Sequence, residues 1–312
     1  METTTEFNDN QIENNLDQEI FVEVKPSHEV TLYAEPIYHI SSFPVTNALF
    51  TSWIAVFLII IIVIFLRRKL QQIPKGIQNF FEIILDGALL LCDQVTGNRK
   101  ISNKVFPLAF SVFLFVLINN WLGILPLGGL GLVERGGRES VFIPFIRSGT
   151  ADINTTLTLA LIAVVSANIF GIISVGIWKA FNKYVNIRAL GQMVTKVRQD
   201  PTILVVSPVT FFVGILEFVG EFAKVASLSF RLFGNIFAGE VLLVSMSALL
   251  AYGLPIPFLF LEIFIGLIQA FIFAILMLVY FTIAAQDHDE HEPASTDASQ
   301  SGEHEHEEKL AT

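Results

Sequence analysis

The stretch from Ser207 to Leu250 carries ionisable and amide side chains inside a long apolar helical pattern. These residues are Glu217, Glu221, Lys224, Arg231, Asn235 and Glu240. Because an α-helix turns about 100° per residue, the first five fall, together with Ser227, within an arc of roughly 120°, whereas Glu240 points to the opposite side. Two polar surfaces on one membrane helix indicate two separate water-accessible compartments.

The last apolar stretch of the chain carries a second polar face. Glu262, Gln269 and Tyr280 are spaced by seven and eleven residues, which places them on one side of a helix. A short turn joins this helix to the preceding one, so we expect Glu262 and Gln269 to lie against its polar side. Acids aligned within a membrane favour a proton or ion pathway.

Arg231 has no acidic neighbour on its own helix. The residues three and four positions away are Ser227, Leu228, Gly234 and Asn235. A structural salt bridge to another helix is one interpretation. A functional role is favoured, because a guanidinium without a partner is costly at membrane depth.

The other charged residues indicate a function less strongly than Arg231 does. Glu217, Glu221 and Lys224 could be ordinary solvated charges near the inner interface. Glu240 and Glu262 could each pair in the core, although cations for such pairs are scarce there.

Composition predicts an all-α integral membrane protein. The chain is 53% hydrophobic and 15% charged, with a mean hydropathy of +0.62. Five crossings are expected, with an amphipathic inner-surface or re-entrant helix at about 74–97 and two long tilted C-terminal helices forming a hairpin. The crossings are expected at about 48–66, 105–125, 153–178, 207–250 and 258–285.

The stretch 207–250 is too long for a perpendicular crossing. With Ser207 as N-cap and Pro208 at the first helical position, the helix would measure about 65 Å, whereas the hydrocarbon core is about 30 Å thick. The helix must therefore lie strongly tilted or break, for instance near Gly234 or Gly239.

The charge distribution predicts three segments and an orientation. Residues 1–43 form an acidic, partly disordered segment, 44–285 the membrane domain, and 286–312 a disordered acidic tail rich in histidine. Loops 67–104 and 179–198 hold 12 Lys and Arg, against three in the remaining loops, where Glu134 and Glu139 partly offset Arg135, Arg138 and Arg147. By the positive-inside rule the N-terminus is outside and the C-terminus cytoplasmic.

Several classes of function find no support in the sequence. Cys92 is the single cysteine, so no disulfide framework or cysteine-based metal site is expected. No phosphate-binding loop, nucleophile elbow or zinc motif occurs, so we expect no catalytic chemistry in this chain alone, no cofactor and no metal. The basic residues lie in short loops, which argues against a nucleic-acid partner.

Several motifs resemble one known family. These are SLSFRLFGNIFAGE at 227–240, QAFIF at 269–273 and Tyr280, with AEPIYHI at 34–40, PKGIQNFFE at 74–82, NNWLGILP at 119–126, DINTTL at 152–157 and LEFVGEFAK at 216–224. Together they resemble subunit a of the bacterial F-type ATP synthase membrane sector. The SLSFRLFGN stretch is the most specific of them.

The resemblance implies a stator subunit of the bacterial cytoplasmic membrane. Its implied partners are a rotating ring of c subunits, subunit b of the peripheral stalk, the rest of the complex and the lipid bilayer. Arg231 would face the ring carboxylates and separate two half-channels. The resemblance assigns Asn235, Glu240, Glu262 and Gln269 to the outer path and Glu217, here with Glu221, to the inner one, and leaves Asn120, Lys224 and Tyr280 as further candidates. Some members carry a histidine in place of Glu240 or Glu262, or an acid in place of Gly123.

Two other classes of function stay open at this point. One is a secondary transporter or ion channel subunit in which Arg231 binds an anionic substrate, although no second half of the chain resembles 207–285. The other is a structural membrane scaffold, which would leave the polar stripe unexplained.

Overall fold

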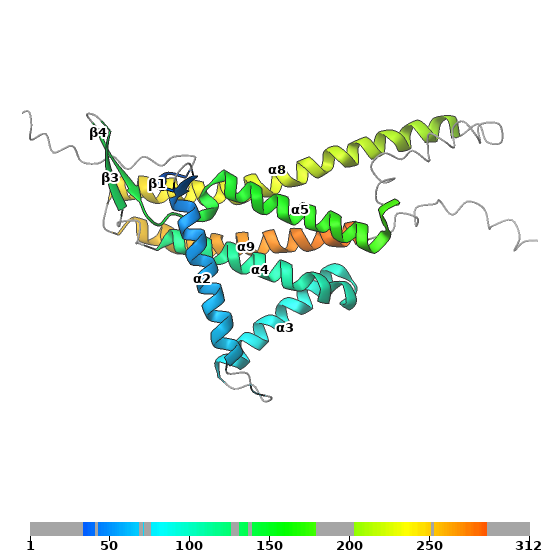
Figure 1. Cartoon of the computed structure of the whole chain (residues 1–312), viewed down its shortest axis with the longest axis horizontal. Helices are drawn as coiled ribbons and strands as arrows, with labels where there is room; N and C mark the ends of the chain where they lie inside the picture. Colours follow the sequence, from blue (N-terminus) through cyan, green and yellow to red (C-terminus); the bar gives the residue numbers. More distant parts are fainter. Residues whose placement is uncertain are drawn as a thin grey trace, which may run out of the picture. The chain divides into compact units, whose positions relative to one another are not determined.

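The described part of the chain is almost entirely helical (Figure 1). The computed structural model describes residues 34–40, 43–68, 71, 76–125, 131–136, 139–178, 203–250 and 253–285. Within them lie α2 (Asn47–Arg68), α3 (Ile77–Thr96), α4 (Arg99–Ile124), α5 (Ile153–Val175), α8 (Ile203–Leu249) and α9 (Pro255–Ala285). All of these except α3 contain a stretch long and apolar enough to cross a membrane. The predicted class, an all-α multi-pass membrane protein, is confirmed.

The helix α8 begins earlier than predicted and does not break. It starts at Ile203 rather than Ser207, and Pro208 lies inside it. Gly234 and Gly239 are both within the continuous helix. At 1.5 Å per residue its 47 residues extend about 70 Å, more than twice the hydrocarbon thickness of about 30 Å.

Two short hairpins occupy stretches for which the sequence analysis predicted no strands. Strands β1 (Pro36–Ile40) and β2 (Phe43–Thr46) pair antiparallel, as do β3 (Gly131–Gly136) and β4 (Glu139–Pro144). The first hairpin leads directly into α2, where the Thr46 hydroxyl accepts a hydrogen bond from the Leu49 N–H at 3.3 Å. This bond satisfies one of the unpaired donors at the start of the helix.

The chain divides into two compact units. The first comprises Met1–Ile162 and Ala223–Leu276, and the second Ala163–Phe222 and Met277–Thr312. In the first unit α2 packs on α4 and on the short helix η2 (Gly149–Ala151). Small buried residues of α2, among them Ala48 and Ala55, allow this close packing.

In the second unit α5 and α9 approach closely at Gly171. An added Cβ at this position would lie 2.6 Å from the Ala284 carbonyl oxygen, so only glycine fits. Nearby, the rings of Phe170 and Phe281 pack edge to face with centroids 5.5 Å apart.

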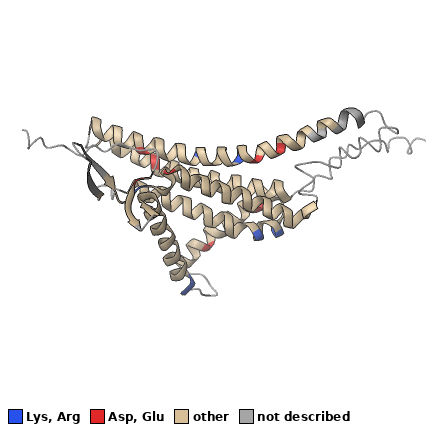
Figure 2. Ribbon diagram, turned by 45° about the horizontal axis from the view of Figure 1, so that its top comes forward, with Lys and Arg blue, Asp and Glu red and all other residues tan. Residues whose placement is uncertain are grey.

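Most of the exposed helical surface is apolar. Phe57, Phe212 and Phe260 are each more than 60% exposed, and Figure 2 shows few charged residues along the long helices. Such a surface is unfavourable in water and suits lipid. Residues 1–33 and 286–312 lie outside the described part, so the disorder expected there stays a prediction.

Candidate functional site

Arg231 lies on the face of α8 that is not packed against the chain's own core. Leu228 and Leu232 are buried, with 1% and 0% exposure, whereas Arg231 and the neighbouring Phe230 are exposed. Within the described residues, Arg231 forms no hydrogen bond or ion pair. The sequence predicted that its own helix supplies no anion. That prediction is confirmed and extends to every described carboxylate.

One turn beyond Arg231, an amide pair joins α8 to α9. The Asn235 side chain donates a hydrogen bond of 2.7 Å to Oε1 of Gln269, and Gln269 is only 2% exposed. The expectation that Gln269 lies against the polar side of α8 is therefore confirmed. The pair connects the exposed face around Arg231 with the interior of the α8–α9 hairpin.

Glu262 is buried in the first unit without a cation partner. Its side chain is 7% exposed, and its Oε2 has no hydrogen-bond partner among the described residues. The carboxylate lies against the backbone of α8 at Gly239, where an added Cβ would be 2.7 Å from Cδ of Glu262. Gly239 thus creates the space that the carboxylate fills.

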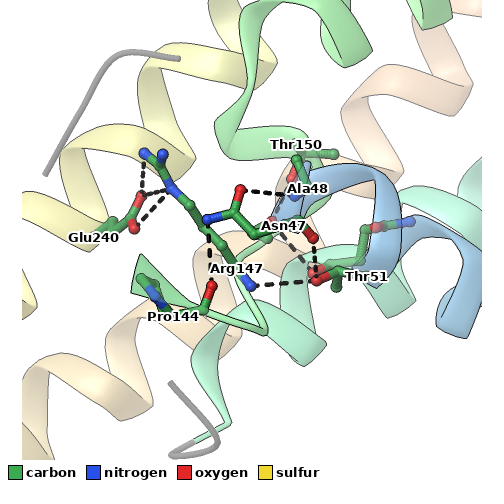
Figure 3. Close-up of polar contacts among 9 residues, drawn as sticks. Asn47, Ala48, Thr51, Pro144, Arg147, Thr150 and Glu240 are labelled. Carbon is green, nitrogen blue, oxygen red and sulfur yellow. Dashed lines mark hydrogen bonds and ion pairs between the residues drawn. The ribbon is translucent and has the colours of Figure 1, made fainter. Parts of the chain in front are cut away.

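Glu240, in contrast, has a cation partner. Arg147, from the segment between β4 and η2, donates from Nη2 to Oε2 of Glu240 at 3.0 Å, and its Nε lies 3.0 Å from Oε1 and 3.1 Å from Oε2 (Figure 3). Arg147 is 5% exposed, so the pair is largely removed from solvent. The expected shortage of cations holds for Glu262 and is wrong for Glu240.

Sequence reasoning missed Arg147 because Glu134 and Glu139 are closer to it in the chain than Glu240. The signal that could have found it is the position of Arg147 shortly before the DINTTL motif, where the chain returns to the membrane.

A cluster of polar side chains links α2, α4 and the segment around η2. It comprises Ser52 of α2, Asn119 and Asn120 of α4, and Ser148 and Thr150 around η2. Thr150 donates to Oδ1 of Asn120, and Asn120 donates to the Gly266 carbonyl of α9 at 3.0 Å. The candidate Asn120 therefore connects the η2 segment with α9.

The position of Gly123 is closed to any side chain. An added Cβ would lie 2.9 Å from both the backbone nitrogen and the Cα of Ser148. This close approach requires glycine at this position.

The candidates for the inner path lie mostly in the second unit. Glu217 and Glu221 are half-buried, and Asn168 of α5 donates a hydrogen bond of 3.1 Å to Oε2 of Glu221. Tyr280, also in this unit, is half-buried, as is Lys224 in the first unit. Asn168 is a polar partner of Glu221 that helical periodicity along α8 alone did not identify.

Comparisons with known proteins show the family to which the chain is similar. The family model for the ATP synthase A chain matches residues 49–282. A relative from Gloeobacter violaceus, described as ATP synthase subunit a, is 34% identical over 245 residues, covering 78% of this chain and 86% of the relative. Proteins of the same description from Syntrophobacter fumaroxidans and Mycobacterium tuberculosis are 34% and 33% identical, covering 75% and 79% of this chain and 82% and 89% of their own lengths. The chain therefore belongs to the ATP synthase A chain family, that of subunit a of the F-type enzyme.

Proposed function

We propose that this chain is the proton-translocating stator subunit of the ATP synthase membrane sector, working beside a ring of c subunits. The observation that carries the proposal is Arg231, a fixed cation inside an apolar span that no described residue neutralises. A positive charge in this position favours an anion supplied by a neighbouring protein. The ring carboxylate of a c subunit is such an anion.

The outer path is proposed to pass Glu240 and Glu262 and to reach the ring near Asn235 and Gln269. Buried polar groups and carboxylates at this end of α8 offer successive positions for water and protons. A proton that arrives neutralises a ring carboxylate, and the neutral acid can then move into lipid, where the charged form is costly.

The inner path is proposed to run past Glu221 and Glu217. A ring carboxylate that reaches this path loses its proton toward the cytoplasm and becomes charged again. Arg231 separates the two paths, since its fixed charge repels a proton and favours the ionised ring carboxylate. Each proton that crosses delivers about 2.3 kcal/mol per 100 mV of membrane potential.

The proposed setting is the bacterial cytoplasmic membrane, with the N-terminus outside and the C-terminus in the cytoplasm. Subunit b of the peripheral stalk and the rest of the complex are further proposed partners. Within this assembly the chain conducts protons, and ATP chemistry belongs to other subunits.

The test is proton-driven ATP synthesis in membrane vesicles that carry Arg231→Ala or Arg231→Lys. Both variants are expected to reduce synthesis to background, because Ala removes the charge and Lys can lose its proton in a dry site. Arg67→Ala, at the exposed end of α2, removes an arginine outside the proposed paths and serves as the control. Normal synthesis by assembled Arg231→Ala would refute the proposal.

A further inference from the structure

The two carboxylates proposed for the outer path differ in what surrounds them. Both oxygens of Glu240 lie within 3.1 Å of the Arg147 guanidinium. Oε2 of Glu262 has no partner among the described residues, although the side chain is more than nine-tenths buried. A buried polar atom without a partner is rare in proteins and points to a function.

Arg147 is itself held firmly in place (Figure 3). Its backbone N–H donates to the Thr51 hydroxyl at 3.2 Å, and this hydroxyl donates to the Asn47 carbonyl at 3.0 Å. The Asn47 amide in turn donates to the Pro144 carbonyl at 3.4 Å. The start of α2 thus fixes the segment that presents the guanidinium, and Arg147 has little freedom to release Glu240.

A permanently charged guanidinium with two or more bonds to one carboxylate makes a specific, strong pair. Glu240 can take up a proton only by losing its ion pair with Arg147, and breaking a buried ion pair is strongly unfavourable. Oε2 of Glu262 can take up a proton without breaking such a bond, because it has no hydrogen-bond partner among the described residues. Among the described residues, the charged group that acts on Glu262 is Glu240 of α8, which is itself paired with Arg147, and the uncharged Trp121 of α4 donates to the neighbouring Ile263 carbonyl.

We propose that Arg147 is a positioning residue that commits Glu240 to a fixed ion pair, so that Glu262 alone carries protons along the outer path. This inference rests on the proposed function. In each cycle a proton from outer water binds Oε2 of Glu262 and gives the neutral acid. The same proton then leaves for a ring carboxylate and restores the anion, while the Arg147–Glu240 pair stays neutral as a unit.

Passive proton flux through vesicles stripped of the catalytic sector tests this division of roles. Glu240→Gln and Glu262→Gln make the same chemical change at the two acids. Glu262→Gln is expected to reduce flux to the background leak, a loss on the order of 100-fold. Glu240→Gln removes the ion pair with Arg147 and is expected to lower flux less, and Arg147→Gln/Glu240→Gln is expected to recover flux relative to either single variant. Arg147→Lys, which keeps the charge, is expected to be milder than Arg147→Gln.

A chemical readout separates this role from a purely structural one. Hydrophobic carbodiimides modify protonated carboxyl groups in apolar surroundings, and mass spectrometry locates the modified residue. In the intact complex we expect modification of Glu262 and none of Glu240. Arg147→Gln should make Glu240 reactive, because Glu240 can then take up a proton. If Arg147 had a purely structural role, the protonation of Glu240 would not change and Glu240 would stay unreactive.

Several outcomes would overturn the inference. They are normal flux in Glu262→Gln, background flux in the assembled double variant, or modification of Glu240 in the unaltered chain. If the double variant does not accumulate, the exchange Arg147→Glu/Glu240→Arg replaces it, because the exchanged pair keeps one cation and one anion. Background flux in the exchanged variant would also contradict the inference. Failure of the proposed function is distinct, because it would appear as normal proton-driven ATP synthesis by assembled Arg231→Ala.

Discussion

Gly239 offers a test at the scale of one residue. The Cβ of Gly239→Ala would meet the Glu262 carboxylate, with Cδ at 2.7 Å. Because that carboxylate is the far end of a flexible side chain, we expect it to move while the complex still assembles. A displacement of about 1 Å in a proton-transfer group can cost up to about 100-fold in rate. Passive proton flux per assembled complex measures the effect.

The matched control is Gly87→Ala on α3, where an added Cβ meets no atom within 4 Å. Flux in this variant should match that of the unaltered chain. If Gly239→Ala assembles and conducts equally well, the position of Glu262 is not critical.

The Arg147–Glu240 pair could not be predicted from the sequence, whereas the Asn235–Gln269 contact could. Helical periodicity relates residues on one helix, and a short turn fixes which face of the next helix lies opposite. Asn235 and Gln269 meet across such a hairpin. Arg147 and Glu240 are 93 positions apart and meet only because α2 and α4 fix the segment that carries Arg147. Periodicity contains no information about that arrangement.

At the scale of elements, Gly123 tests how the segment around η2 packs on α4. Any Cβ at this position would lie 2.9 Å from backbone atoms of Ser148, which cannot move aside as a side chain could. Gly123→Ala and Gly123→Asp should therefore both destabilise the chain, by about 1–3 kcal/mol for the overpacking alone. The thermal stability of the purified complex and the amount of chain in the membrane are the measurements.

Gly87→Ala and Gly87→Asp are the controls, because Gly87 is exposed on α3 with open space around it. If Gly123→Asp were as stable as Gly87→Asp, the close contact with Ser148 would not determine packing here.

The elements themselves were predictable to different degrees. Long apolar runs predicted five long helices, since a helix is the favoured way to satisfy a backbone in lipid, and five such helices are found, although α4 begins at Arg99 rather than near residue 105. The start of α8 was placed four residues too late because Pro208 favours a first helical turn, yet it lies inside the helix. The two hairpins were missed, because 34–46 and 131–144 mix aromatic, charged and proline residues without a clear period of two.

At the scale of the whole molecule, no described residue of the chain neutralises Arg231. Arg231 is exposed, and the neighbouring Phe230 on α8 also presents an exposed apolar side chain. An exposed cation with apolar neighbours suits an apolar partner that carries an anion. The proposed ring of c subunits has that chemistry.

Orientation is the prediction that concerns the entire chain. The uneven distribution of Lys and Arg predicts an outer N-terminus and a cytoplasmic C-terminus. Single cysteines introduced as Asn10→Cys or Ser299→Cys report on each end in intact cells treated with a membrane-impermeant maleimide. We expect Asn10→Cys to react and Ser299→Cys to react only after the membrane is permeabilised.

The native Cys92 should add little background, since it is 4% exposed and both burial and the nearby Asp93 raise the pKa of its thiol. Cys92→Ser in the same background checks this, and the reverse labelling pattern would exchange the outer and inner paths and contradict the proposed direction of proton flow.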